Sequence, residues 1–193
     1  MKFIHTSVIL LCLLLAILGD TAMSDSQPKV QLETNKGTII IELDADKAPL
    51  TVANFIGYAE SGFYDGTIFH RVIENFMIQG GGFTPDMQQK KTQPNIENEA
   101  NNGLKNVKGS IAMARTSAPH SASSQFFINA KDNGFLDFTS ESPQGWGYAV
   151  FGQVVEGIEI VEMIENVATG NVGPYSDVPK DPVIIEKASV ISD

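Results

Sequence analysis

The residues best suited to chemistry lie close together, between positions 69 and 81. If this segment is extended, its side chains alternate between two faces, and Arg71 points away from the side of both its neighbours. The run Phe76-Met77-Ile78 breaks the alternation with three apolar residues in succession, which cannot all face one core. Either part of the run lines a second apolar surface, such as a pocket, or the strand is buried on both faces.

Other catalytic chemistries have weak support in the sequence. Beyond the N-terminal stretch the histidines are His70 and His120, and neither belongs to a metal-ligand spacing. A Ser-His-Asp arrangement stays open, but no nucleophile-elbow pattern supports it. Glycines 80–82 lack the Lys-Ser/Thr of a phosphate loop, and the single cysteine, Cys12, lies in the N-terminal stretch. We therefore expect neither a metal nor a cofactor.

The N-terminal stretch has the layout of a secretory signal peptide. Lys2 precedes an uncharged apolar run of eleven residues, Val8 to Leu18, and a small-residue site, Ala22-Met23-Ser24, follows it. The run is short for a membrane span, which takes about 20 residues. We expect residues 1–24 to be removed and residues 25–193 to form the mature domain, without a stable membrane anchor. The expected compartment is the periplasm, with secretion or an uncleaved anchor as alternatives.

Length and composition fit one globular domain. The 193 residues are 42% hydrophobic and 19% charged, which allows a single well-buried core. The formal net charge is -10, and such a charge repels phosphate. Nucleic acid and anionic membrane surfaces are therefore poor partners, and we expect a monomer.

Hydrophobic patterning predicts many short strands and two helices. Runs of β-prone residues at 30–34 and 38–43 flank a Gly-containing turn and predict a hairpin. One helix is expected at 48–62, where a proline opens and a glycine closes a run with helical spacing, and another at 158–167. Further strands are expected at 68–72, 76–79, 110–114, 125–129, 148–155 and 183–191. This pattern favours a closed or nearly closed antiparallel barrel whose open ends the helices cap.

Three sequence blocks closely resemble the signature of the cyclophilins. The first runs from Phe69-His70-Arg71-Val72-Ile73 through Phe76-Met77 to Gln79-Gly80-Gly81. The second joins Ser110-Ile111-Ala112-Met113-Ala114-Arg115 to Ser123-Ser124-Gln125-Phe126-Phe127-Ile128. The third joins Phe135-Leu136-Asp137 to Tyr148-Ala149-Val150-Phe151-Gly152-Gln153-Val154. The resemblance covers about 30–191 and is greatest to the exported bacterial branch. It implies a mainly β fold, a closed eight-stranded antiparallel β-barrel capped by two α-helices.

The resemblance also implies an activity and a site. The activity is that of a peptidyl-prolyl cis-trans isomerase, which acts on X-Pro bonds in unfolded or flexible polypeptides. Arg71 corresponds to the catalytic arginine, and Gln79 to the glutamine that orients it. The pocket for the proline ring is implied at Phe76, Met77, Phe127 and Leu136. The positions that hold the substrate backbone are implied at Ala114, Arg115 and Gln125.

Three positions depart from the common family pattern. Phe135 stands where many members carry a Trp that contributes to cyclosporin binding, so we expect weak sensitivity to that drug. Tyr148 stands where many carry His, and its apolar body and hydroxyl still suit a pocket. Both are kept as substrate-binding residues. Arg115 replaces a common Asn; if substrate is held there through the backbone, the side chain bears on substrate preference.

Two alternatives remain from the sequence. The first is a proline-peptide-binding chaperone without catalysis, and the presence of Arg71 together with Phe76, Gln79 and Phe127 argues against it. The second is an exported serine hydrolase, which would need either His70 or His120 as its base.

Overall fold

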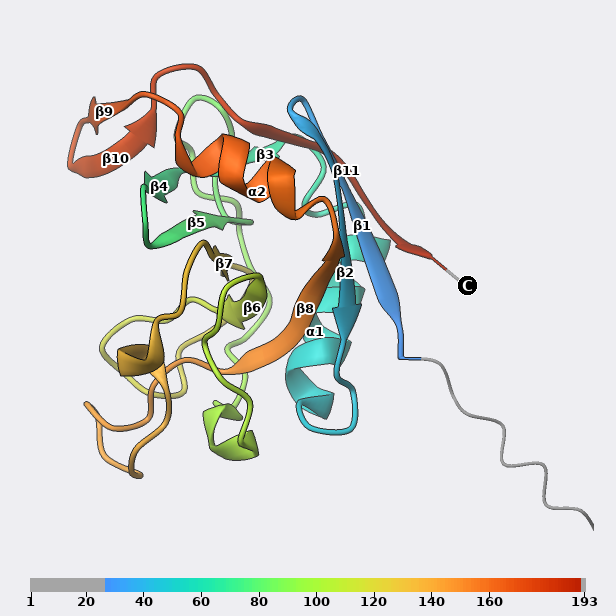
Figure 1. Ribbon diagram of the computed structural model, residues 1–193, viewed down its shortest axis with the longest axis vertical. Coiled ribbons are helices and arrows are strands. Elements are labelled where there is room, and N and C mark those ends of the chain that lie inside the picture. Colours follow the sequence, from blue (N-terminus) through green and yellow to red (C-terminus); the bar gives the residue numbers. More distant parts are fainter. Residues whose placement is uncertain (1–26, 192–193) are drawn as a thin grey trace, which may run out of the picture.

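An antiparallel sheet of nine strands runs through residues 27–191, the part of the chain that the computed structural model describes (Figure 1). Its spatial order is β3-β11-β1-β2-β8-β6-β7-β5-β4. The strands are β1 (Lys29–Thr34), β2 (Gly37–Leu43), β3 (Thr67–Ile68), β4 (Arg71–Ile73), β5 (Met77–Gly80), β6 (Ser110–Met113), β7 (Phe126–Asn129), β8 (Val150–Glu156) and β11 (Ile184–Ile191). The mainly β class predicted from the sequence is confirmed. The predicted signal peptide, residues 1–24, lies outside the described residues.

The sheet curls until its two edges meet. The edge strands β3 and β4 are separated in sequence by only two residues, Phe69 and His70. At this break the backbone changes partners: the amide of Phe69 donates to the carbonyl of Val183 (2.9 Å), whereas β4 pairs with β5. The strand predicted at 68–72 is therefore divided, which turns the expected eight strands into nine.

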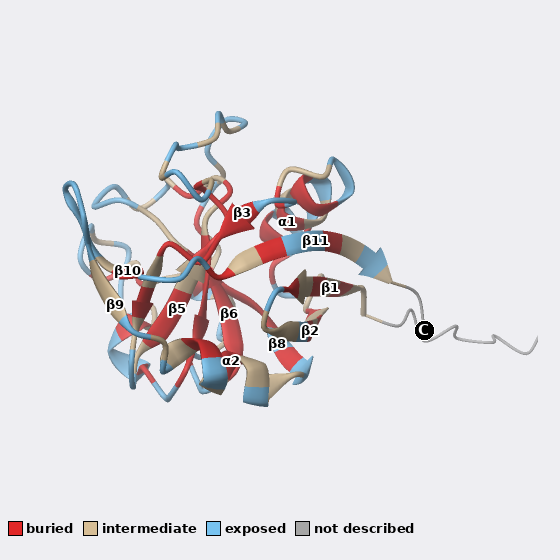
Figure 2. Cartoon of the chain, turned by 90° about the horizontal axis from the view of Figure 1, so that it is seen from above, coloured by how far each residue is buried: buried red, intermediate tan, exposed pale blue. Residues whose placement is uncertain are grey.

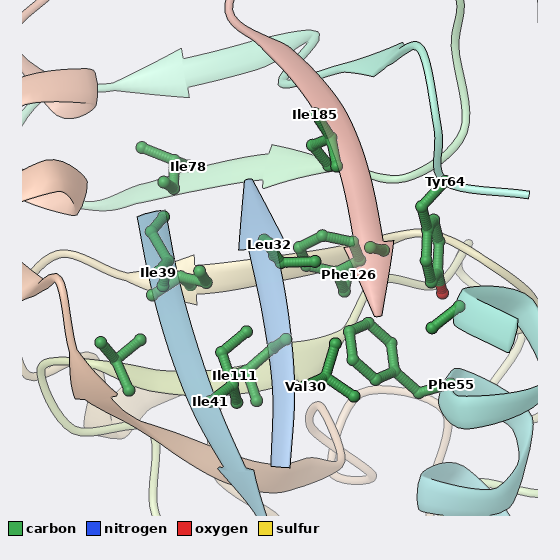
Figure 3. Packing of buried hydrophobic residues seen from close by; sticks show 14 of the residues in the cluster. Val30, Leu32, Ile39, Ile41, Phe55, Tyr64, Ile78, Ile111, Phe126 and Ile185 are labelled. Carbon is green, nitrogen blue, oxygen red and sulfur yellow. The ribbon is translucent and has the colours of Figure 1, made fainter. Parts of the chain in front are cut away.

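The inside of the curled sheet is the hydrophobic core. Strands β1 and β2 alternate regularly, so that Val30 and Leu32 point inward beside Ile39 and Ile41 (Figure 3). All four side chains are fully buried, and each such burial stabilises the fold by about 1.5–3 kcal/mol. The predicted hairpin at this position is confirmed, with the two strands in continuous register.

Two helices close the core from opposite sides of the barrel (Figure 1). Helix α1 (Pro49–Glu60) begins at its proline and packs Phe55 against the barrel. Helix α2 (Ile158–Glu165) buries Val161 and Ile164 in the same core. Both helices were expected, although α2 ends two residues earlier than its pattern predicts. Among the described residues, no helix has the length and apolarity that crossing a membrane requires.

A small hairpin that the sequence pattern does not predict stands beside the edge strand β4 (Figure 1). It consists of β9 (Thr169–Val172) and β10 (Tyr175–Pro179), and much of it is exposed (Figure 2). Its register shifts between Tyr175 and Val178, and within this shift Asp177 adopts a positive φ of 60°. Because this segment contains glycines and a proline and has an irregular register, it lacks the alternation of apolar and polar residues that predicts a strand.

Candidate active site

Cross-strand register aligns the two candidate catalytic residues, Arg71 and Gln79, in one row with residues of two further strands. Arg71 on β4 lies opposite Gln79 on β5, Gln79 opposite Phe127 on β7, and Phe127 opposite Ala112 on β6. Adjacent strands are about 4.8 Å apart, so the row brings together residues from four separate segments. Ile78, between two residues of the row's face, points inward and is fully buried in the core. The row therefore lies on the outer face of the barrel.

A second apolar cluster covers this outer face. We call it the outer cluster; its buried members are Met77, Ala112, Phe127, Leu136 and Val150. Met77 belongs to the outer cluster and its neighbour Ile78 to the core, while Phe76 packs half-buried against the outer cluster just before β5 begins. The three successive apolar residues are thus explained by both hypotheses at once, because β5 is buried on both faces and one face lines a pocket.

The pocket at the outer cluster has a volume of about 120 Å³. Its lining residues are Arg71, Phe76, Met77, Gln79, Ala114, Arg115, Phe127, Leu136 and Tyr148. All nine belong to the set of eleven selected from the sequence. A larger hollow of about 270 Å³ between β2 and β8 contains none of that set. We place the candidate site at the smaller pocket, because there the guanidinium of Arg71 borders a cavity lined mainly by apolar side chains.

The two remaining selected residues, Phe135 and Gln125, lie beside the pocket. Phe135 is 75% exposed and stacks on Phe76 with the ring centroids 5.8 Å apart, so it extends the rim. Gln125 lines an adjoining groove, where its side-chain oxygen accepts a hydrogen bond from Nε2 of Gln79 (3.0 Å). This bond fixes the orientation of the Gln79 side-chain amide.

Arg71 is held loosely at the edge of the pocket. Its side chain is 42% exposed, and its Nε lies 3.9 Å from Oδ2 of Asp177 on the β9–β10 hairpin. Arg71 and Gln79 are cross-strand neighbours, and within residues 27–191 no hydrogen bond joins their side chains. Asp177 is a site residue that the sequence analysis missed, since nothing in the local pattern links position 177 to position 71.

Arg115 is fixed much more firmly on the other side. Its Nε donates to the carbonyl of Gly147 (2.7 Å) and its Nη1 to that of Thr116 (2.9 Å). The guanidinium also lies over the ring of Tyr148, 4.8 Å from the centroid. Tyr148 in turn meets Phe127 edge-on, with centroids 5.5 Å apart, so these contacts form one continuous wall.

Comparison with known proteins identifies this arrangement. Residues 29–190 match the family model of the cyclophilin type peptidyl-prolyl cis-trans isomerases. The chain belongs to the cyclophilin family. Peptidyl-prolyl cis-trans isomerase B of Escherichia coli is 60% identical over 161 residues, which cover 83% of this chain and 98% of that protein. Peptidyl-prolyl cis-trans isomerase cyp18 of Streptomyces antibioticus is 59% identical over 162 residues, 84% of this chain and 98% of the relative.

Solved structures agree with the sequence match. The crystal structure of a Cryptosporidium parvum cyclophilin type peptidyl-prolyl cis-trans isomerase, obtained in the presence of the dipeptide Ala-Pro, superposes with a TM-score of 0.70. The two chains are 28% identical, and the superposition covers 86% of this chain and 99% of the C. parvum chain. The predicted family is therefore confirmed, and the chain is a peptidyl-prolyl cis-trans isomerase.

A buried network of asparagine side chains supports the backbone of this cyclophilin site. The sequence analysis did not identify this network. Nδ2 of Asn133 donates to the carbonyl of Phe76 (2.9 Å) and to Oδ1 of Asn129 (2.8 Å). Nδ2 of Asn129 continues the chain to Oδ1 of Asn106 (3.2 Å). The sequence offers one indication of this network, namely that a polar residue, Asn129, directly follows the apolar run that ends at Ile128.

The loop that carries Leu136 is anchored to the same network. Oδ1 of Asp137 accepts hydrogen bonds from the backbone N–H (2.8 Å) and side-chain amide (3.0 Å) of Asn106. Burial by itself raises the pKa of Asp137, but these bonds and nearby Lys105 outweigh it, so the pKa lies below its ordinary value. The carboxylate form that anchors the pocket loop is thereby favoured.

His70 lies next to Arg71 in sequence but does not line the pocket. It is buried, its ring packs 4.5 Å from that of Phe83, and its Nδ1 has no partner within the described structure. Burial lowers the pKa of His70 to about 4, and the positive charge of Arg71 adds to the effect, against hydrogen bonds to Ile68 and Gln125 that raise it. The ring is therefore neutral at physiological pH, which fits a structural role.

We predict that Asn133→Ala destabilises the fold by about 1–3 kcal/mol, because it leaves the buried carbonyl of Phe76 and Oδ1 of Asn129 without their donor. Urea unfolding of the variant measures this loss. Asn171→Ala, an exposed position on β9, serves as the matched control and should change the stability by less than about 0.5 kcal/mol. Equal effects at the two positions would contradict the supporting role of the network.

The His70 environment predicts a dependence of stability on pH. The unfolded state binds a proton near the ordinary pKa of 6.5 and the folded state only near 4, so stability falls as pH drops through this window. Between about pH 7.5 and 4.5 the wild-type protein should lose roughly 2–3 kcal/mol more than His70→Gln. Urea unfolding at both pH values tests this, and equal losses in the two proteins would refute it.

Proposed function

We propose that Arg71 is the catalytic residue of this isomerase and that the pocket beside it holds the proline ring. The observation that carries the proposal is the juxtaposition of a guanidinium with a small apolar cavity. At about 120 Å³ the cavity is far below the ~300–1,000 Å³ of sites for drug-sized ligands. A single side-chain ring, gripped by Met77, Phe127 and Leu136, is the occupant that suits it.

Arg71 suits the chemistry of amide rotation. The barrier to rotation is about 18–20 kcal/mol, because the C–N bond has partial double-bond character. In the transition state this bond is twisted, resonance is lost, and the prolyl nitrogen carries a localised lone pair. A guanidinium that donates to this nitrogen stabilises the twisted form more than the planar one, which is differential binding of the transition state. Arginine stays protonated throughout, so the donor is always present.

The apolar pocket contributes in two further ways. It immobilises the proline ring while the preceding carbonyl group rotates, so the rotation is confined to one bond. It also excludes water, and the contact between Arg71 and the prolyl nitrogen is stronger in the resulting low dielectric. Gln79 acts as a positioning residue beside Arg71, held in place through Gln125.

The substrates are proline-containing segments of unfolded or flexible polypeptides, and the consequence of the activity is assistance to protein folding. The C. parvum relative was crystallised in the presence of Ala-Pro, a proline-containing dipeptide, which agrees with substrates of this kind. A non-catalytic peptide-binding role is the alternative. It is less well supported, because the pocket retains Arg71 at its edge.

Replacement of the guanidinium tests the proposal. Arg71→Ala should lower kcat/KM for cis-to-trans exchange of a proline-containing test peptide by about 100- to 1,000-fold, as loss of one preorganised transition-state donor does elsewhere. Thermal unfolding should stay nearly unchanged, since the side chain is 42% exposed and its ion pair with Asp177 is long. Unchanged exchange by a folded Arg71→Ala protein would refute the mechanism. Absence of exchange by the wild-type protein would favour the chaperone alternative.

We further propose that the enzyme works as a monomer in the periplasm after removal of residues 1–24. The support is the positive N-terminus, the apolar run from Val8 to Leu18 and the small-residue site that follows it. Osmotic shock of expressing cells should release a protein whose intact mass corresponds to residues 25–193 and which sediments as a monomer. A variant lacking residues 2–24 should remain in the cytoplasm. Retention of the full-length protein in the membrane fraction would contradict the proposal.

A further inference from the structure

A polar groove continues from the prolyl pocket along the outside of the barrel. Its volume is about 540 Å³, and it shares Gln79, Ala114 and Arg115 with the pocket. The other lining residues are Gln89, Thr92, Asn95, Thr116, Ala118, Ser121, Ser123 and Gln125. A polypeptide that places its proline in the pocket therefore has room to place a neighbouring side chain in the groove.

The charge of this groove differs from that of the whole protein. The chain carries 23 acidic residues and a formal net charge of -10. Yet the described residues that line the groove include no carboxylate, and Arg115 is their one charged member. The rest of the lining consists mainly of amide and hydroxyl groups, which can donate hydrogen bonds to an anion. The lining of the groove thus carries one positive and no negative side chain, on an otherwise acidic protein.

Arg115 is both preorganised and unpaired. Of the five N–H donors of an arginine, two are bound to the carbonyls of Gly147 and Thr116. The remaining three have no acceptor, and no carboxylate forms an ion pair with the guanidinium, anywhere in residues 27–191. Exposed Glu97 shares a small neighbouring cavity with Arg115 but makes no ion pair with it. Arg71, by contrast, already faces Asp177.

We propose that Arg115 is a specificity-determining residue that selects substrates with an aspartate or glutamate two residues from the isomerised proline. An extended chain advances about 3.3–3.6 Å per residue, which brings such a side chain from the pocket into the groove. This inference rests on the proposed function, because it assumes that the proline occupies the pocket lined by Phe127 and Met77.

The fixed position of Arg115 is what makes the selection effective. Two backbone carbonyls and the ring of Tyr148 already hold the guanidinium, so little conformational freedom is lost when a carboxylate binds. Charge-assisted hydrogen bonds from an arginine are stronger than neutral ones and match a carboxylate geometrically. A lysine in the substrate would instead bring a like charge to the same place and be disfavoured.

Matched peptides test the proposal. Each contains one proline, with Glu, Gln or Lys placed two residues before it or two residues after it. At one of the two positions, kcat/KM of the wild-type enzyme should be about fivefold higher for Glu than for Gln, and lower again for Lys. The Glu preference should shrink as salt is added. Because each ratio compares two peptides on one enzyme preparation, partial unfolding of a variant cancels.

Three variants assign the preference to its residue. Arg115→Gln should bring the Glu-to-Gln ratio to about one, and Arg115→Lys should keep part of it, because the charge remains while the two backbone bonds are lost. Lys187→Gln, an exposed position on β11, removes the same charge elsewhere and should leave the ratio as in the wild type.

The outcomes separate this inference from the function on which it rests. If the wild-type enzyme isomerises the Gln peptides but shows a ratio of about one at both positions, the inference is wrong and the proposed function stands. A Glu preference that survives in Arg115→Gln also overturns the inference. If the wild-type enzyme isomerises no peptide, both fail.

Discussion

The burial of the sheet on two faces is the constraint on which the structure depends. Ile78 and Val72 fill the barrel from β5 and β4, while Met77 on β5 faces the outer cluster. Because side chains alternate strictly along a strand, packing of the inner face fixes which residues reach the outer one. A slip of one residue would send Arg71 into the core and destroy core and site together. Stability and catalytic geometry are therefore set by one register.

The outer face could not form a pocket from strands alone. Its depth comes from loops, which carry Leu136 and Tyr148 over the sheet and are fixed by buried polar groups. Asn133 and Asp137 supply hydrogen bonds that the irregular backbone needs there, and Asn129 binds the side chain of Asn133. A buried polar network is costly to disturb, so we expect pocket shape and local stability to be coupled.

The two arginines of the site are held in different ways. Arg71 is 42% exposed and makes a long ion pair with a carboxylate oxygen 3.9 Å away. Arg115 is fixed by two backbone carbonyls and an aromatic face, and so presents an unchanging charge to whatever enters the groove. This difference fits the proposed roles of the two residues, Arg71 as the donor to the twisting amide and Arg115 as the residue that discriminates between substrates.

The sequence by itself determined the strands with clear alternation, the helix that begins at Pro49, and the blocks whose residues line the pocket, because these depend on local pattern and motif. Only the tertiary structure decided the division of the strand before Arg71, the outward position of Phe135, and the approach of Asp177 to Arg71. Each depends on contacts between segments far apart in the chain. Local periodicity does not specify which distant carbonyl or carboxylate a side chain contacts. These three features are therefore determined only in the folded structure.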